Sequence, residues 1–193
     1  MNISDNIKGA LIMSGSMLAF VLNDGLMKIL FADWSIYQAI FLRGILTIPL
    51  MLFFAWKTKQ LVVKLSSSDW KLIVIRTASE VGAAIFFLSA LAHMPLANVT
   101  AILQVLPLAV TMGAAIFLRE SVNWRRWLAI FIGFIGVMII VRPGMEGFSV
   151  YSISALCAVA CVTVRDLTTS RLSSKTPSMF VALITGIAMT VLG

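Results

Sequence analysis

The stretch that decides the fold is Ala10–Phe31, which reads ALIMSGSMLAFVLNDGLMKILF. It is long enough to cross a bilayer, because a transmembrane helix needs about 20 mainly apolar residues. Its second half nevertheless carries Asn23, Asp24 and Lys28. A charged side chain near the middle of a bilayer costs about 2.5–3.5 kcal/mol on insertion scales, so it normally faces a protein interior or a wet cavity.

Two interpretations of these polar residues stand side by side. Asp24 and Lys28 are spaced i, i+4, which places them on one face of a helix. They form either a self-neutralising pair that lets the helix insert, or one wall of a polar pathway through the membrane. The polar residues in the other predicted spans bear on which of these two interpretations applies.

The composition indicates a polytopic membrane protein. Hydrophobic residues make up 60% and charged residues 12% of the 193-residue chain, whereas soluble proteins average about 45–50% and 25%. The net charge of +7 does not indicate a nucleic-acid partner, because the basic residues fall in short loops, where they set topology. Cys157 and Cys161 lie in an apolar run and His93 is the only histidine, so no disulfide, metal site or cofactor is expected.

Seven apolar stretches predict an all-α fold, a polytopic transmembrane helix bundle. The connections between them are short, so consecutive helices are expected to be antiparallel neighbours. The predicted spans are Ala10–Phe31, Ser35–Trp56, Trp70–His93, Ala97–Leu118, Trp127–Val141, Val150–Leu172 and a last run from Pro177 to Gly193.

The distribution of lysine and arginine predicts a multi-pass protein of the cell (inner) membrane with a cytoplasmic N-terminus. In this orientation Arg142 is the only basic residue at an outside loop, while Lys28 and Arg43 lie within the membrane. The others lie in or near inside loops: Lys8, Lys57, Lys59, Lys64, Lys71, Arg76, Arg119, Arg125, Arg126, Arg165, Arg171 and Lys175. An excess of this kind is what the positive-inside rule describes.

A weak internal repeat becomes visible when the chain is shifted against itself by 142 positions. Leu22-Asn23-Asp24 then falls on Val164-Arg165-Asp166, and Gly44-Ile45 falls on Gly186-Ile187. Five spans separate the two copies, so the second copy enters the membrane from the opposite side. Asp24 lies about 10 Å from the outer end of its helix and Asp166 about 9 Å from the inner end of its own. Such mirrored depths are typical of the inverted repeats of secondary transporters.

The repeat sets the expected domain organisation. Residues 1–145 are expected to form a first five-helix unit, and residues 146–193 the first two helices of an inverted second unit. A missing second-half polypeptide or a homodimer is therefore an expected partner, besides the lipid bilayer. An intramembrane aspartyl protease is disfavoured, because Asp24 and Asp166 lie near opposite membrane faces and cannot share a proton.

Three further stretches carry a family pattern: Phe41-Leu42-Arg43-Gly44, Ala90–Pro107 and Phe117–Gly144. They resemble the EamA-type permeases of the drug/metabolite transporter superfamily. The resemblance implies ten helices in two inverted five-helix halves, around a central cavity used for alternating access. It implies a secondary transporter of a small organic metabolite or drug rather than an enzyme. The alternative is a truncated, non-transporting fragment or a helper subunit that needs a partner chain.

The candidate substrate-cavity residues share a depth in the membrane. Asp24, Arg43 and Gln104 all lie about 10–12 Å from the outer ends of their helices, so we expect one polar layer that also includes Asn23. Within it, Asp24 is expected to pair with Arg43, because each would otherwise leave an unpaired charge at low dielectric. This pair either only joins the first two helices, or lines the cavity and rearranges during transport.

Glu80 and two prolines complete the candidate site. Glu80 lies near the membrane midplane, where it is either a protonation site that couples proton flow to transport or a group neutralised by Arg76 one turn earlier. Pro49 and Pro107 are predicted helix kinks, because proline removes a helical hydrogen bond. The freed carbonyl is tolerated in a membrane where it lines a cavity or meets a neighbouring helix.

Overall fold

The computed structural model describes residues 5–31, 33–58, 60, 65–141, 149–173 and 176–193. Within these residues the chain forms helices and no strand, which confirms the predicted all-α bundle. The helices are α1 (Asp5–Leu30), α2 (Ile36–Lys57), α3 (Ser67–His93), α4 (Leu96–Leu103), α5 (Leu106–Phe117), α6 (Trp124–Val141), α7 (Val150–Ser170) and α8 (Ser178–Leu192).

The helices have the length and composition of membrane spans. Five apolar segments of the described chain are long enough to cross a bilayer: Ile7–Leu30, α2, α3, the combined α4–α5 segment and α7. The helix α8 is a shorter apolar helix. Large apolar side chains remain exposed along these segments, as expected where lipid, not water, surrounds the protein. The chain is therefore a multi-pass membrane protein.

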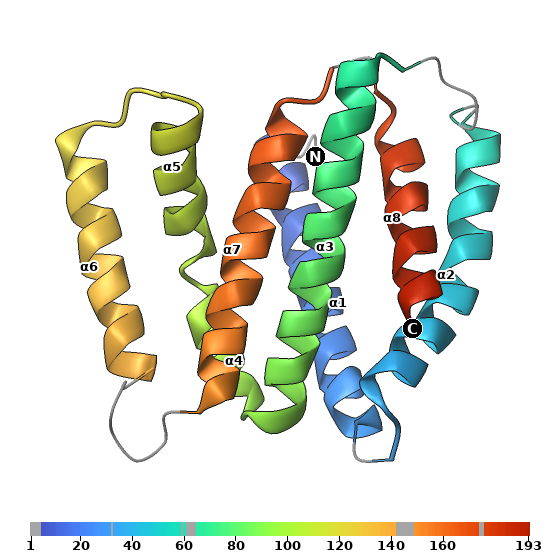
Figure 1. Ribbon diagram of the computed structural model, residues 1–193, viewed down its shortest axis with the longest axis horizontal. Helices are drawn as coiled ribbons and strands as arrows, with labels where there is room; N and C mark the ends of the chain where they lie inside the picture. The colour runs from blue at the N-terminus through green and yellow to red at the C-terminus, as the bar shows by residue number, and fades with distance from the viewer. Residues whose placement is uncertain (1–4, 32, 59, 61–64, 142–148, 174–175) are drawn as a thin grey trace.

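If α4 and α5 are taken as one span, the spans run alternately up and down, with α6 and α2 at opposite edges and α7 and α3 between them (Figure 1). We call one end of the bundle the basic end: α1, α3, α6 and α8 begin there, and α2, α5 and α7 end there (the upper end of Figure 1). Its described basic residues include Lys57, Lys71, Arg125, Arg126 and Arg171. Arg142 and the predicted boundary between residues 145 and 146 lie outside the described residues.

The main helix contacts join helices that are distant in sequence. The most extensive pair is α3 with α7, followed by α2 with α8. With α4 and α5 counted as one span, consecutive spans are antiparallel as predicted (Figure 1), but the most extensive contacts do not lie between them. A short connection fixes only where two helix ends lie, whereas small residues decide which faces can approach. At Gly44, for example, an added Cβ would lie 1.9 Å from Thr190 Oγ1.

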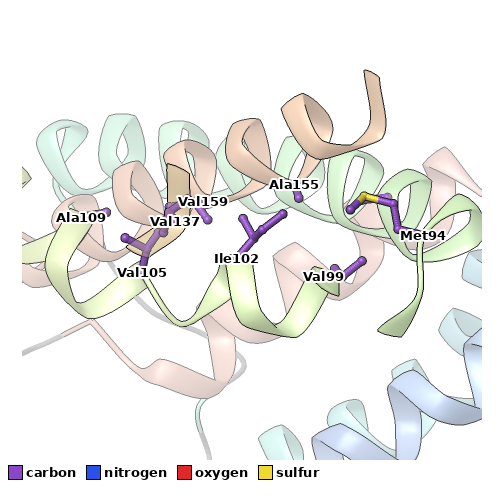
Figure 2. Packing of buried hydrophobic residues seen from close by; sticks show 9 residues of the cluster. Met94, Val99, Ile102, Val105, Ala109, Val137, Ala155 and Val159 are labelled. Atoms are coloured by element: carbon purple, nitrogen blue, oxygen red, sulfur yellow. The ribbon is translucent and has the colours of Figure 1, made fainter. Parts of the chain in front are cut away.

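The buried core lies where α3, α4, α5, α6 and α7 meet. Figure 2 shows its apolar side chains, which are Ala90, Met94, Val99, Ile102, Val105, Ala109, Val137, Ala155 and Val159. A second, smaller cluster joins α1, α2 and α3 through Met27, Ala39, Ile40, Leu88 and Leu91. The helix α1 enters only this second cluster, and just 6% of its apolar window is buried.

The predicted fourth span is divided into two helices. The helix α4 ends at Leu103 and α5 begins at Leu106, with Pro107 in its first turn. Proline is suited to this position, because the first helical N–H groups have no intrahelical partner in any case. Pro49, in contrast, lies inside the continuous helix α2.

Candidate functional site

An open groove of about 330 Å³ lies between α1 and α2 and is lined by Ser16, Ala19, Phe20, Asn23 and Arg43. The four α1 residues lie at positions i, i+3, i+4 and i+7, which places them on one face of the helix. Arg43 reaches the groove from α2. Small-molecule sites typically occupy about 300–1,000 Å³, so the groove is large enough for a metabolite.

The polar groups of the groove form a short chain of interactions. Asn23 Nδ2 donates to Asp24 Oδ1 at 3.3 Å, and Asp24 also interacts electrostatically with Arg43. Within the described residues, however, no direct ion pair joins Asp24 to Arg43. The exposed Arg43 side chain therefore keeps N–H donors that a ligand in the groove can reach.

Lys28 does not neutralise Asp24. Its Nζ donates to the carbonyl oxygen of Leu91 and, at 2.7 Å, to that of Met94. Both carbonyls lie at the C-terminal end of α3, where the last helical carbonyls have no intrahelical donor and a positive charge is favoured. The interpretation of Asp24 and Lys28 as a self-neutralising pair is therefore wrong, because Lys28 instead connects α1 to α3.

Gln104 does not join the groove. It lies exposed between α4 and α5, and these helices pack against α6 and α7 rather than against α1 and α2. The expected layer of Asp24, Arg43 and Gln104 is thus not assembled. Depth along a helix could be estimated from the sequence, but the lateral position of α4 depends on its tertiary contacts.

A second polar cluster lies where α3 meets α7. Arg165 Nη1 lies 3.1 Å from Glu80 Oε2 and 3.2 Å from Oε1. Its Nη2 lies 2.8 Å from Asp166 Oδ1. The guanidinium group thus bridges two carboxylates from two helices, and the Arg165 and Glu80 side chains are 27% and 28% exposed.

One interpretation of the sequence expected Arg76 to neutralise Glu80, but Arg76 has other partners. Its Nε donates to Thr169 Oγ1 at 3.0 Å, and its Nη1 donates to Thr185 Oγ1 at 2.8 Å. These contacts connect α3 to α7 and to α8. Arg165 is predicted from the charge distribution to lie in or near an inside loop, whereas the repeat that aligns Arg165-Asp166 with Asn23-Asp24 is the sequence signal for its role in this cluster.

The described residues contain no group of three or more His, Cys, Asp or Glu side chains that could hold a metal ion. The candidate site therefore consists of organic polar groups: an amide, carboxylates, guanidinium groups and hydroxyls. Such groups can bind and release a polar solute, and they can form and break contacts between helices.

The sequence of the chain matches a known protein family and several named relatives. Residues 7–142 match the EamA-like transporter family. A riboflavin transporter of Brucella anthropi is 31% identical over 136 residues, which are 70% of this chain and 44% of that protein. A riboflavin transporter of Vibrio cholerae is 36% identical over 100 residues, 51% of this chain and 34% of that protein.

Shorter matches exist to other transporters. An S-adenosylmethionine uptake transporter of Rickettsia bellii is 34% identical over 55 residues, 28% of this chain and 19% of that protein. The matched part of the chain spans less than half the length of each of these relatives. No solved structure matches the chain.

Proposed function

The chain belongs to the EamA-like transporter family, and from this premise we propose that it acts in secondary transport of a small polar organic metabolite across the cell membrane. The observation that carries this proposal is the groove between α1 and α2. It brings Asn23 and Arg43 together between two predominantly apolar spans. Polar side chains in a span are costly unless they serve a pathway or a partner.

The lining of the groove supports a substrate with a flat heteroaromatic ring. Phe20 offers an aromatic face, Asn23 an amide that can donate and accept, and Arg43 a planar set of N–H donors. Rings stack on aromatic faces, and guanidinium groups bind acceptor-rich edges. Relatives named for riboflavin and S-adenosylmethionine fit this substrate class.

Arg43 tests the proposal most directly. In proteoliposomes loaded with unlabelled metabolite, we expect counterflow of labelled riboflavin or S-adenosylmethionine. The substitution Arg43→Gln should lower kcat/KM about tenfold or more, since it removes a charge-assisted hydrogen bond. Arg43→Lys, which keeps the charge without the planar donors, should have a kcat/KM between those of the unmodified chain and Arg43→Gln.

Arg125→Gln is the matched control. It removes an exposed arginine at the basic end of the bundle, and the guanidinium group of this arginine lies over the ring of Trp124. It should transport as the unmodified chain does. Wild-type transport by Arg43→Gln, at equal amounts of folded protein, would exclude the groove as the substrate site.

We also propose that residues 1–145 form one repeat and that residues 146–193 begin an inverted second repeat. The alternative role, a subunit that requires a partner chain, is favoured by one observation: α1 is almost uncovered, with 6% of its window buried. Co-expression with a polypeptide that carries the complementary half of a relative should then be required for counterflow. Transport by the purified chain alone would exclude this alternative.

A further inference from the structure

Polar contacts between helices gather towards the basic end, where α3 meets α7 and α8. Arg165 of α7 bonds to Glu80 of α3 at 3.1 Å, and Arg76 of α3 bonds to Thr169 of α7 and Thr185 of α8. Thr77 of α3 also lies 3.5 Å from Thr185, measured between hydroxyl oxygens. We call the following set the α3–α7–α8 latch: Arg76, Glu80, Arg165, Asp166, Thr169 and Thr185.

The latch is electrically balanced, with two guanidinium groups and two carboxylates. Charges taken out of water are stable only while their partners are in place, because each lone charge must otherwise be solvated again. Since Arg165 and Glu80 are still 27% and 28% exposed, water can reach them when the helices separate. This combination suits a contact that opens and closes better than it suits a permanent core.

The repeat relates the latch to the groove between α1 and α2. The shift of 142 positions aligns Asn23-Asp24 with Arg165-Asp166 and Arg43 with Thr185. In both segments the side chain donates to the carboxylate that follows it in sequence. Asp24 lies about 9 Å before the end of α1, whereas Asp166 lies about 6 Å before the end of α7, which is the basic end.

We propose that the α3–α7–α8 latch is the gate that closes the basic end of the transport path while the groove between α1 and α2 is open. The proposal rests on the transport function proposed above. The helix α3 lies in the first predicted unit and α7 and α8 lie in the second, so the latch joins the two units. When one unit rocks against the other, these contacts have to break. Arg76 and Arg165 are therefore positioning residues of the closed state.

A native cysteine makes the gate testable. An added Cβ at Gly82 of α3 would lie 3.3 Å from Cys161 Sγ of α7, so Gly82→Cys brings two thiols within reach of a disulfide. The experiment uses the full chain in membranes, with Cys157→Ser, and follows mild oxidation by the loss of maleimide labelling. The rate of disulfide formation reports how often α3 and α7 are held together.

The variants separate a gate from a merely structural contact. Arg165→Gln should slow disulfide formation at least about fivefold, the lower range of coupling between conformational states. Thr185→Val, which removes an acceptor of Arg76 without changing any charge, should slow it less. Arg171→Gln is the matched control at the end of the same helix, because Arg171 bonds only weakly to Phe117 of α5, at 3.5 Å. Unchanged rates in both Arg165→Gln and Thr185→Val would overturn the proposal.

Transport supplies the second readout. The fully cross-linked Gly82→Cys protein should lose counterflow and regain it after reduction of the disulfide. Undiminished counterflow by fully cross-linked protein would overturn the gate, because α3 and α7 would then not need to separate. If the reduced protein carries no substrate at all, the proposed function fails, whereas the oxidation rates still decide whether the latch controls the separation of α3 and α7.

Discussion

Lys28 illustrates how backbone carbonyls can bind a charged side chain within an apolar helix. Its ammonium group donates to Leu91 and Met94 at the C-terminal end of α3, where helical carbonyls are otherwise unpaired. The neighbouring carboxylate of Asp24 accepts a hydrogen bond from Asn23 and interacts electrostatically with Arg43. Two charges spaced i, i+4 on one helix therefore serve different partners, a result that spacing alone could not provide.

Removal of the Lys28 contact should destabilise the protein. We expect Lys28→Met to lower the free energy of unfolding by about 1–2 kcal/mol, since two α3 carbonyls lose a charged donor. The measurement is the Tm of the detergent-solubilised protein. Lys71→Met, an exposed position near the start of α3, is the control and should leave Tm unchanged. A Tm of Lys28→Met equal to that of the unmodified protein would show that water or detergent replaces the ammonium group.

Proton coupling through Glu80 is a prediction that can be tested against its contact with Arg165. Its carboxylate is bound by Arg165 of α7, so removing its charge removes an ion pair between α3 and α7. Glu80→Gln is therefore expected to alter the closed state rather than to abolish a pH dependence. Uptake measured between acidic and neutral pH checks this expectation: loss of its pH dependence in Glu80→Gln would restore the coupling interpretation.

At the level of elements, glycine decides which helices meet. The helices α2 and α8 cross at Gly44, where an added Cβ would lie within 2.7 Å of three side-chain atoms of Thr190. The repeat aligns Gly44 with Gly186, and Gly186 faces Met51 of α2 across the same helix pair. Close backbone approach thus joins α2 to α8, the second helices of the two proposed units.

The crossing of α2 and α8 yields a stability prediction. Gly44→Ala should lower the free energy of unfolding by about 1–3 kcal/mol, because the methyl group overfills a packed site. Gly136→Ala is its matched control: Gly136 is also helical, but nothing lies within 4 Å of an added Cβ. This control should be neutral or slightly stabilising, since alanine is the better helix former. Thermal unfolding of both variants in the same detergent distinguishes the effect of overpacking at the α2–α8 contact from the effect of helix propensity.

The break between α4 and α5 follows from one residue. Pro107 cannot continue the hydrogen bonding of a helix, and α4 ends at Leu103 before α5 begins at Leu106. Pro49 in α2 has no such effect on helix continuity. The same residue type therefore has two outcomes, which depend on the contacts around each helix.

At the scale of the whole molecule, the charge bias gives an orientation that can be measured. In a chain with Cys157→Ser and Cys161→Ser, we expect Asp33→Cys, between α1 and α2, to react with a membrane-impermeant maleimide in intact cells. Asn123→Cys, just before α6 at the basic end, should react only after permeabilisation. Both positions are exposed. The reverse pattern of labelling would place the N-terminus outside and contradict the positive-inside assignment.

The sequence by itself determined the fold class, because the apolar length that lets a helix cross a bilayer is a local property of the chain. Five of the seven predicted spans correspond to described helices that are long and apolar enough to cross a membrane. It also singled out Asn23, Asp24, Arg43 and Glu80 as polar residues within apolar helices, since the predicted cost of such a group in a bilayer depends on its type and position. Of the predicted spans, only the fourth was divided, and the proline responsible was visible in the sequence.

Only the tertiary structure decided which polar groups meet. The partner of Glu80 is Arg165 from a helix 85 positions away in sequence, not Arg76 one turn earlier. Gln104 lies with α6 and α7 rather than beside Arg43. The physical reason is that periodicity fixes depth and face along one helix, whereas lateral position depends on how small residues let distant helices pack.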